Sequence, residues 1–400
     1  MRIQRTIPPA AAPINLKSLL HGLAGVFMGY KYSKNIEEEI KKYFDVKHVF
    51  LVSSGKAALT LILMALKSLS PRKEVLIPAY TCFSVPSAIV KAGLKASLCD
   101  IDSKTFNLDY KLLEKAINKD TLCVVPNHLF GISADMDKIK SICKNKDIFI
   151  VEDAAQAMGG FYKGKKLGTI GDIGFFSLGR GKNITSGSGG IIITNSDAIA
   201  HAIEKEYAKL YESTTLEQVV DFCKMALMSL FIRPSLYWFP AGLPFLKLGE
   251  TIFYKDFPIK KLSRMEAGLL NGWQERLEKT NQIRKENAEY FSERLRSRLR
   301  LSNGGEGRGE GAIPYLRLPV LLDNKEERDS LYSISQKKGL GVSAMYPTPI
   351  NEIGEIKNQF NGSAFPSAKR ISETLLTIPT HHLLSERDKE KIAKYIKLRN

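Results

Sequence analysis

The stretch DIGFFSLGRGKNITSGSGGIIITN, residues 172–195, is the most informative part of this chain for its fold. An apolar strand, IGFFSL, leads into a glycine-rich turn that contains Lys182, and a second glycine-rich turn leads into the strand GIIITN. Burial in such a crossing would lower the pKa of the lysine amine and make it a nucleophile for a carbonyl group. A single lysine in a loop is more often a surface residue, so the stretch alone leaves both interpretations open.

The chain from about residue 48 to 200 alternates short apolar runs with helical patterns. The run HVFLVSS precedes AALTLILMALKSL, EVLIPAY precedes VPSAIVKAG, TLCVVPNHLFG precedes DMDKIKSICKNK, and DIFIVEDAA follows. This alternation predicts an α/β fold with a mostly parallel sheet flanked by helices. Because ligands of open α/β sheets bind beyond the carboxyl ends of the strands, the residues directly after each run are the candidates for chemistry.

Composition and length limit the class of protein. A length of 400 residues predicts two domains, or one large α/β body with an appendage. The composition, 44% hydrophobic and 25% charged, is ordinary for a globular protein and excludes collagen-like, coiled-coil and disordered chains. After residue 200 we expect a helical segment, a proline- and aromatic-rich segment at 222–257, a long helix from Ser263 to Arg300, and a glycine-rich loop at 302–312 before a smaller C-terminal α/β unit.

The charge balance of 59 Lys and Arg against 42 Asp and Glu gives a formal net charge of +17. This surplus favours anionic partners such as nucleic acid, an acidic membrane surface or phosphorylated small molecules, or it is only a solvated basic surface. No zinc-finger spacing, RNP-like aromatic string or long basic run occurs, so we expect no nucleic acid partner.

Cysteine usage and hydropathy predict a cytoplasmic protein. The five cysteines form no CxxC pair, which argues against a disulfide framework and a metal site. The first residues lack the apolar core of a signal peptide. The most apolar stretch, 225–246, is interrupted by Arg233 and three prolines, so we expect no membrane-spanning helix.

Two further strand ends carry candidate site residues. The run VFLVSS ends in Ser53-Ser54-Gly55-Lys56 directly before a helix, and helix N-termini favour phosphate, although a serine-rich helix cap has the same pattern. The run DIFIVEDAA places Glu152 and Asp153 at a strand end, where a carboxylate either holds a cationic ring nitrogen or caps a helix. Together with Lys182 these groups supply what pyridoxal phosphate needs: a phosphate site, an acid for its ring nitrogen and an amine for its aldehyde.

With these residues in place, the chain resembles the DegT/DnrJ/EryC1/StrS family of sugar aminotransferases, which are fold-type-I pyridoxal-phosphate enzymes. The resemblance runs from roughly residue 35 to 398 and rests on long motifs in the same order. These are IPAYTCFSVPSAIVKAG, HLFGISADMD, VEDAAQAMGGFYKGKKLGTIGDIGFFS, KNITSGSGG, YPTPINEI and FPSAKRISETLLTIPTH. The resemblance implies an N-terminal extension at 1–34, a large cofactor-binding domain at 35–255, and a long helix with a small C-terminal domain at 256–400.

The resemblance also implies roles for individual residues. Lys182 would bind the cofactor aldehyde covalently and then act as the general acid and base. Asp153 would pair with the ring nitrogen, and Gln156 would face the hydroxyl side of the ring. The phosphate would be held by Ser54, Gly55, Lys56 and Ser177. For the substrate, the resemblance points to Tyr346 and to His128, for which a structural hydrogen bond is the alternative.

Several positions depart from the family pattern. Lys56 replaces a threonine, and Met158 replaces a common histidine. Cys82 stands where many relatives place an aromatic residue that stacks on the cofactor ring, with Phe83 and Tyr80 as the candidate substitutes. Leu262 replaces an asparagine that contacts the phosphate of the partner subunit, and Lys260 or Lys261 could compensate.

The expected activity is transfer of an amino group from an amino acid, glutamate in our prediction, to a nucleotide-linked keto sugar for polysaccharide or glycan biosynthesis, by a homodimer. Lysine at position 182 favours this activity, because relatives that dehydrate their substrates can carry histidine there. The alternatives are another pyridoxal-phosphate reaction, such as dehydration or transamination of a non-nucleotide substrate, and a non-catalytic membrane- or partner-binding relative. The segment 222–257 is expected to be core or dimer interface, or else a membrane-surface patch.

Overall fold

The computed structural model describes residues 4–12, 14–28, 30–246, 248–249, 251–295 and 313–397. The predicted loop at 302–312 and the predicted helical residues 296–300 lie outside these ranges. The elements that build the larger part of the molecule are α1 (Leu16–Phe27), α2 (Lys31–Phe44), β1 (His48–Val52), α3 (Gly55–Leu69), β2 (Glu74–Pro78), α4 (Ser84–Lys91), β3 (Lys95–Cys99), α5 (Tyr110–Ala116), β4 (Thr121–Val124), η1 (Leu129–Gly131), α6 (Met136–Cys143), β5 (Phe149–Asp153), β6 (Phe161–Tyr162), β7 (Lys165–Lys166), β8 (Ile173–Ser177), β9 (Gly190–Thr194) and α7 (Asp197–Tyr207).

Within the described residues, seven strands form the main sheet in the order β1-β9-β8-β5-β4-β2-β3. The pairs from β8 to β3 are parallel, whereas β9 runs antiparallel to both of its neighbours, β8 and β1. The mostly parallel sheet predicted from the sequence is therefore confirmed. Strand β9 returns the chain from the Lys182 loop, so this loop lies at the same edge of the sheet as the ends of β1, β4 and β5.

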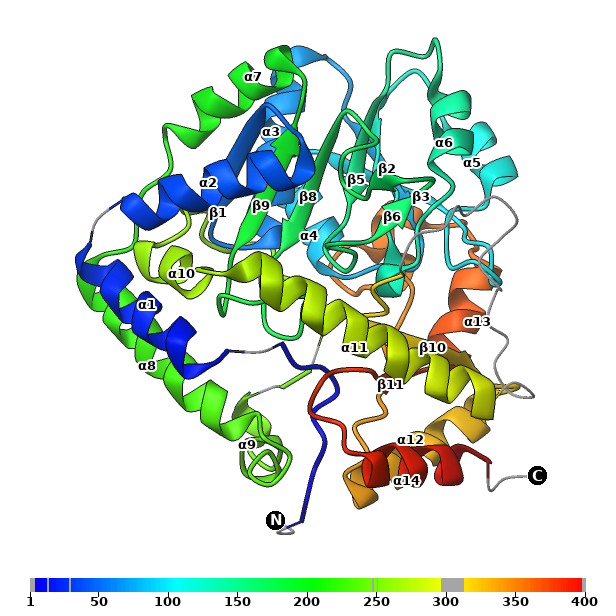
Figure 1. The fold of residues 1–400 in the computed structure, drawn as a ribbon. Helices are drawn as coiled ribbons and strands as arrows, with labels where there is room; N and C mark the ends of the chain where they lie inside the picture. Colours follow the sequence, from blue (N-terminus) through cyan, green and yellow to red (C-terminus); the bar gives the residue numbers. More distant parts are fainter. Residues whose placement is uncertain are drawn as a thin grey trace.

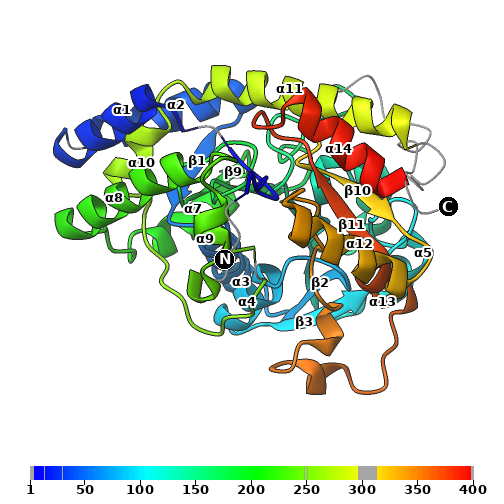
Figure 2. The same cartoon turned by 90° about the horizontal axis from the view of Figure 1, so that it is seen from below.

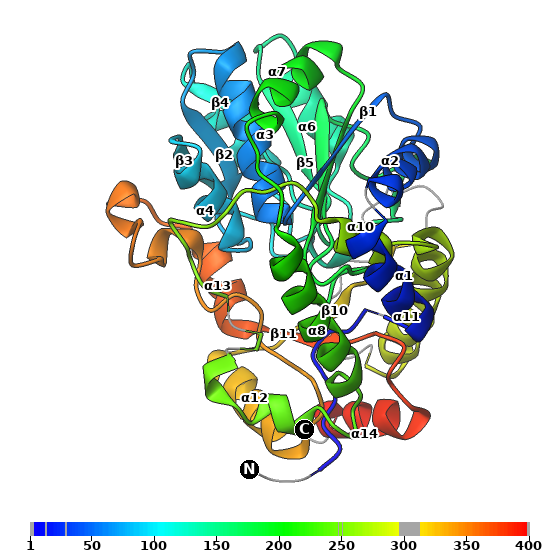
Figure 3. The ribbon, with the colours of Figure 1, turned by 90° about the vertical axis from the view of Figure 1, so that its left-hand side faces the viewer.

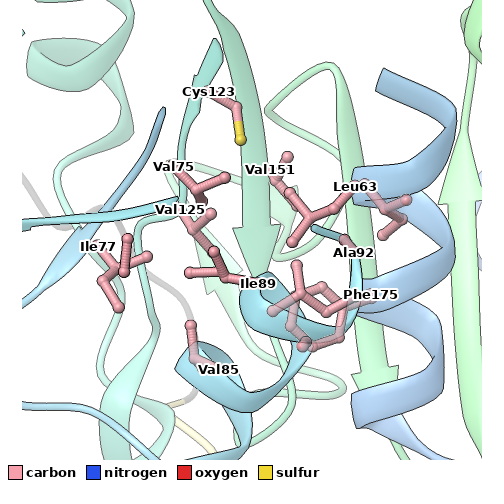
Figure 4. Packing of buried hydrophobic residues seen from close by; sticks show 14 of the residues in the cluster. Leu63, Val75, Ile77, Val85, Ile89, Ala92, Cys123, Val125, Val151 and Phe175 are labelled. Carbon is pink, nitrogen blue, oxygen red and sulfur yellow. The ribbon is translucent and has the colours of Figure 1, made fainter. Parts of the chain in front are cut away.

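Helices cover both faces of this sheet (Figure 1). Apolar side chains alternate between the faces: Phe175 and Ile192 pack with α3, α4 and α7, whereas Phe176 and Ile191 pack with α2. Figure 4 shows the first of these layers, where Leu63 and Ile89 lie against Val151 and its neighbours on the sheet. The strands carry almost no polar side chains in their interiors because both faces are buried.

The rest of the chain begins with α8 (Thr215–Phe231), α9 (Trp238–Ala241) and η2 (Pro244–Leu246). It continues with α10 (Arg264–Leu269), α11 (Trp273–Arg294), β10 (Arg317–Leu321), α12 (Lys325–Lys338), η3 (Ile350–Glu352), η4 (Lys357–Phe360), α13 (Pro366–Thr374), β11 (Leu375–Pro379) and α14 (Glu386–Lys397). Strands β10 and β11 pair antiparallel, and α12 and α14 pack with them around a separate core (Figure 2). The smaller C-terminal α/β unit is thus present, and its predicted boundary at residue 256 remains a prediction.

The predicted single helix from Ser263 is wrong, because two helices occupy this region. Ser263 and Glu266 form a capping box that starts α10, and α10 ends at Leu269. Gly272, with φ of 67°, then adopts the left-handed conformation that an α-helix cannot continue through, and α11 starts after it. The glycine was visible in the sequence, but the charged pattern around it concealed the break.

The N-terminal segment 4–12 is bound to the C-terminal unit. Arg5 forms a bidentate ion pair with Asp388, with the shortest N–O distance at 2.6 Å. The main-chain N–H of Ile7 donates to the carbonyl oxygen of Gly339 at 2.9 Å. The segment therefore joins the start of the chain to the C-terminal unit.

Within the described residues there is neither a membrane-spanning helix nor a cluster of metal-binding side chains. None of the helices in these ranges is both long and apolar enough to cross a membrane. Across the same part of the chain, His, Cys, Asp and Glu side chains form no group of three or more that could hold a metal ion.

Candidate active site

A cavity of about 150 Å³ lies where β1, β4, β5 and β8 end, and one residue of the C-terminal unit closes it. Eight of the nine residues predicted for the site line this cavity: Gly55, Lys56, His128, Asp153, Gln156, Ser177, Lys182 and Tyr346. The ninth, Ser54, lies directly before them and caps α3, where its hydroxyl oxygen accepts from the N–H of Ala57 at 3.0 Å. The structure therefore brings together residues that are up to 292 positions apart, from Ser54 to Tyr346.

Lys182 lies in the loop between β8 and β9 and reaches the cavity wall. Burial lowers the pKa of its amine below the ordinary value, and the buried guanidinium of Arg317 lowers it further. Cys82 and Asp153 oppose this shift. Because a lowered pKa leaves more of the amine uncharged, the environment suits a nucleophile, and the surface-residue interpretation does not hold.

Arg284 of α11 fixes the backbone of this loop. Its guanidinium is fully buried and donates to the carbonyl oxygens of Lys182 and Asn183, both at 3.0 Å, and of Ala11 at 2.9 Å. Burial lowers the pKa of Arg284 to about 9. The sequence analysis missed this residue, since nothing in a charged helical pattern distinguishes one buried arginine from its exposed neighbours.

Asp153 is the last residue of β5 and is buried in the cavity wall. One carboxylate oxygen accepts from the main-chain N–H of Ala155 at 3.1 Å. Burial raises the pKa of the carboxyl group, while Lys182 and His128 act in the opposite direction. The residues directly after Asp153 form a turn and not a helix, so the alternative of a helix N-cap is wrong: the carboxylate closes this turn through the N–H of Ala155.

The start of α3 forms the opposite wall. A Cβ atom on Gly55 would lie 2.8 Å from the Cβ and 3.1 Å from the hydroxyl oxygen of Ser177, so only glycine fits here. The hydroxyl oxygen of Ser177 accepts from the N–H of Gly179 at 3.3 Å. The first turn of a 15-residue helix and a serine hydroxyl thus share one corner of the cavity, a donor arrangement that suits a phosphate.

Lys56 enters the same corner from the second position of α3. Its ammonium lies 4.6 Å from the ring centre of Tyr254 and 4.4 Å from that of Phe257. Burial lowers the pKa of this amine. The two rings hold the side chain through cation–π contacts, so Lys56 places a positioned positive charge at the cavity.

Gln156 joins three segments of the site. Its side-chain oxygen accepts from the N–H of Phe130 at 3.1 Å, and its side-chain nitrogen donates to the hydroxyl of Tyr346 at 2.8 Å. Burial raises the pKa of Tyr346 well above its ordinary value, so the hydroxyl stays protonated. Tyr346 has φ of 21°, an unusual value for a residue with a side chain, and such strain is often found at functional sites.

His128 has both ring nitrogens engaged. Nδ1 accepts from the N–H of Ala134 at 3.1 Å, which leaves Nε2 as the donor to the carboxylate of Glu152 at 3.0 Å. Glu152 also accepts from the N–H groups of Gly168, Ile170 and Gly171 and points away from the cavity. The geometry therefore favours a structural hydrogen-bonding role for His128 over a polar contact with the substrate. The residue still lines the cavity, but both of its ring nitrogens are engaged within the chain.

Of the three residues considered for ring stacking, only Cys82 lines the cavity. Phe83 and Tyr80 are buried in the core around it, and the Tyr80 hydroxyl donates to the carbonyl oxygen of Met345 at 3.1 Å. The expectation that Phe83 or Tyr80 takes over stacking is wrong for this conformation, because both aromatic rings are used for packing.

Asn127 lines the cavity and was missed. Its side-chain nitrogen donates to Thr81 at 3.2 Å, while its buried oxygen has no partner among the described residues. The residue follows the run TLCVV, so the rule that polar residues after parallel strands form the site would have found it.

The positions considered for a partner contact are already engaged. Leu262 is buried and packs in the core beside α2. Lys260 pairs with Glu217 at 2.8 Å, and Lys261 lies 3.9 Å from Glu212. Within this chain these two lysines are therefore neutralised by carboxylates.

The sequence model of the DegT/DnrJ/EryC1/StrS aminotransferase family matches residues 19–217 and 259–397. The chain belongs to this family. A GDP-perosamine synthase of Caulobacter vibrioides is 37% identical over 170 residues, which are 42% of this chain and 46% of that protein. This match spans less than half the length of the relative. A pleiotropic regulatory protein of Geobacillus stearothermophilus is 28% identical over 91% of this chain and 89% of its own.

Solved structures of DegT-family members share the fold. The Escherichia coli GDP-4-keto-6-deoxy-D-mannose-3-dehydratase with bound hydrated pyridoxal phosphate superposes with a TM-score of 0.77 at 18% identity, over 98% of this chain and all of that one. This likeness confirms the fold class predicted from the sequence, a fold-type-I transferase.

The residues present fit pyridoxal phosphate. Gly55 and Ser177 leave a corner with free donors that a side chain would fill. The unpartnered oxygen of Asn127 and the free carboxylate oxygen of Asp153 are acceptors at the same wall. A ligand with a phosphate group, a cationic ring nitrogen and an aldehyde matches these donors, acceptors and the amine of Lys182.

Proposed function

We propose that this protein is a pyridoxal-phosphate-dependent aminotransferase that moves an amino group from an amino acid, glutamate, to a nucleotide-linked keto sugar for polysaccharide or glycan biosynthesis. The observation that carries the proposal is that Lys182, Asp153 and Ser177 line one cavity of a chain in an aminotransferase family. A non-catalytic protein has no need of this combination of an amine with a lowered pKa, a buried carboxylate and a phosphate corner.

Pyridoxal phosphate, when bound, supplies an aldehyde and a ring that accepts electrons during proton transfer. We propose that Lys182 binds it through the side-chain nitrogen and then takes and returns the proton on the substrate carbon that carries nitrogen. Asp153 would hold a proton on the ring nitrogen, and Gln156 would face the ring hydroxyl. The α3 N-terminus from Ser54 to Lys56, together with Ser177, would hold the phosphate.

The positive charge of the protein and the names of its relatives support a nucleotide-linked keto sugar as the substrate. The GDP-perosamine synthase is named for a GDP-linked sugar, and a nucleotide diphosphate brings negative charges to the site. Lys56 supplies a positioned cation at the cavity, and the net charge of +17 favours an anionic substrate. Tyr346 is the proposed substrate contact from the C-terminal unit. For His128 we propose only a packing contact of its ring, because both ring nitrogens are engaged within the chain.

We also propose that the enzyme works as a homodimer in the cytoplasm. The same proposal includes peripheral contact of the segment 222–257 with a membrane.

Turnover with defined substrates tests the proposal. Purified protein with pyridoxal phosphate and glutamate would be mixed with guanosine-, uridine- and thymidine-diphosphate-linked keto sugars, and products identified by mass spectrometry. We expect one sugar to gain an amine while glutamate becomes 2-oxoglutarate, and Lys182→Ala to abolish both. Loss of water from the sugar without amine gain would instead establish the dehydratase alternative.

A further inference from the structure

Helix α1 is apolar on two sides. Its inner side packs on α10 through Gly22 and Gly25, which allow the two backbones to approach closely. Its outer side presents four large apolar side chains at the spacing i, i+4, i+7 and i+11, which places them on one side of a helix. They are Leu16, Leu20, Leu23 and Phe27, with exposed fractions of 72%, 60%, 40% and 72%.

Helix α8 repeats this arrangement. Gln218 and Met225 are buried on its inner side, and Met225 packs with Val26 of α1. The opposite side is exposed along the length of the helix and carries Leu216, Val220, Cys223, Leu227 and Leu230. Figures 1 and 3 show α1 and α8 side by side, so the two apolar stripes belong to one region of the molecule.

The apolar region continues beyond the end of α8. Phe239, Phe245, Leu246 and Leu248 are exposed as well, and Phe245 reaches 75%. This stretch and nearly all of α8 fall in residues 218–258, which the family model leaves unmatched. This part of the apolar surface therefore lies in a segment that the family model does not match, and none of these residues lines the cavity of Lys182.

Cations border the apolar region. Lys17, Lys31, Lys34 and Arg233 are exposed at its edges. Three carboxylates nearby are engaged within the chain: Glu217 pairs with Lys260, Asp221 pairs with Lys224, and Glu212 accepts from the hydroxyl of Tyr30. The four exposed cations named above are the charges that this border offers to an anionic partner.

We propose that α1, α8 and the exposed Phe239, Phe245, Leu246 and Leu248, together the α1–α8 surface, bind the surface of an anionic lipid bilayer. Apolar side chains on a helix side enter the boundary between headgroups and acyl chains, and lysine and arginine at the edge attract anionic headgroups. A second copy of the chain fits less well, because it would bring the same cationic border against this one. The inference does not depend on the proposed reaction.

Vesicle flotation of the full-length holoprotein tests this inference. We expect the protein to float with vesicles of phosphatidylcholine and phosphatidylglycerol and much less with phosphatidylcholine alone. A variant with Leu20→Asp, Phe27→Asp and Leu227→Asp should bind the anionic vesicles at least about tenfold more weakly, since each change places a charge in the apolar boundary. Because these side chains are exposed, the variant should keep its melting temperature and its visible cofactor absorbance.

Leu112→Asp on α5 is the matched control. Leu112 is 41% exposed, similar to Leu23, but lies on the other side of the molecule (Figure 1). It should leave vesicle binding unchanged. The inference is overturned if the wild-type protein does not float, if the triple variant floats as well as the wild type, or if sedimentation shows that the triple substitution converts a dimer into monomers without changing flotation. Turnover of keto sugars is measured separately, so a failure of the proposed function leaves this result unaffected.

Discussion

The guanidinium of Arg284 donates to the main-chain carbonyl oxygen of Lys182 at 3.0 Å, which links helix α11 to the loop that carries the proposed nucleophile. The same group holds the carbonyl oxygens of Asn183 and Ala11. One buried side chain thereby fixes the backbone directly after the Lys182 side chain and connects it to the N-terminal segment. Arg284 acts through the loop and is a positioning residue.

We therefore predict that Arg284→Met slows the capture of pyridoxal phosphate. The substitution leaves three buried carbonyl groups without donors, at roughly 1–3 kcal/mol each, so the free energy of unfolding should fall by about 3 kcal/mol or more. The control is Arg276→Met on the same helix, since Arg276 donates to the carbonyl oxygen of Leu269 and does not touch the Lys182 loop. Chemical denaturation should show a loss of stability in both variants, and only Arg284→Met should change the capture rate measured by absorbance. Equal capture rates in the two variants would show that Arg284 has no positioning role.

Asp153→Asn should separate cofactor binding from chemistry. The amide cannot carry the negative charge that holds a proton on the ring nitrogen, so conversion of the amino donor should fall by about 100-fold or more. Cofactor affinity should change much less, because the phosphate corner and Lys182 are untouched. Single-turnover absorbance measurements give both quantities.

Glu152→Gln provides the comparison for this experiment. Glu152 is buried beside Asp153 but accepts from main-chain N–H groups on the other side of the strand. Its substitution should lower the melting temperature while leaving the conversion rate per folded molecule within about threefold. If Glu152→Gln lost more conversion than Asp153→Asn, Glu152 and not Asp153 would be the carboxylate that holds the proton on the ring nitrogen.

The pH dependence of cofactor capture should report the environment of Lys182. Burial lowers the pKa of its amine from 10.5, so the neutral form appears at lower pH and the capture rate should rise with pH and level off below pH 10.5. Asp153 opposes this shift by favouring the ammonium. Asp153→Asn removes that effect, so the midpoint should move to lower pH. Stopped-flow absorbance across the pH range measures both midpoints, and an upward movement would contradict the assigned geometry.

Gly55→Ala should weaken the binding of pyridoxal phosphate, whereas Lys56→Thr should leave it unchanged. The alanine Cβ would meet Ser177, and the phosphate corner would close, so affinity for pyridoxal phosphate should fall by at least about tenfold, or 1.4 kcal/mol. Lys56→Thr restores the family residue and leaves the α3 amides free, so cofactor affinity should be retained. Fluorescence titration of both variants measures the dissociation constants. Comparable affinity in Gly55→Ala and the wild type would place the phosphate elsewhere.

Much of the fold could be predicted from local sequence pattern. The apolar runs ahead of Ser54 and Asp153 identified strands because both faces of a parallel sheet are buried, and the polar residues after them gathered at one cavity. The break at Gly272 was missed, since helical charge patterning continues on both sides of it. Its left-handed conformation became evident only from the backbone.

The site residues that escaped prediction act through long-range contacts. Arg284 and Asn127 look ordinary in the sequence, because their roles arise from burial and from partners that distant segments provide. Tyr80 and Phe83 show the converse case. Their aromatic character suggested a place on the cofactor, but packing in the core determines where the rings lie.

The central claim is that Lys182 holds pyridoxal phosphate and that the holoenzyme accepts an amino group from glutamate. The most direct measurement is the absorbance spectrum of the purified protein with the cofactor, recorded before and after glutamate is added, beside Lys182→Ala. We predict a visible band that requires Lys182 and that glutamate bleaches. A band that forms equally in Lys182→Ala, or no band in the wild type, would contradict the account.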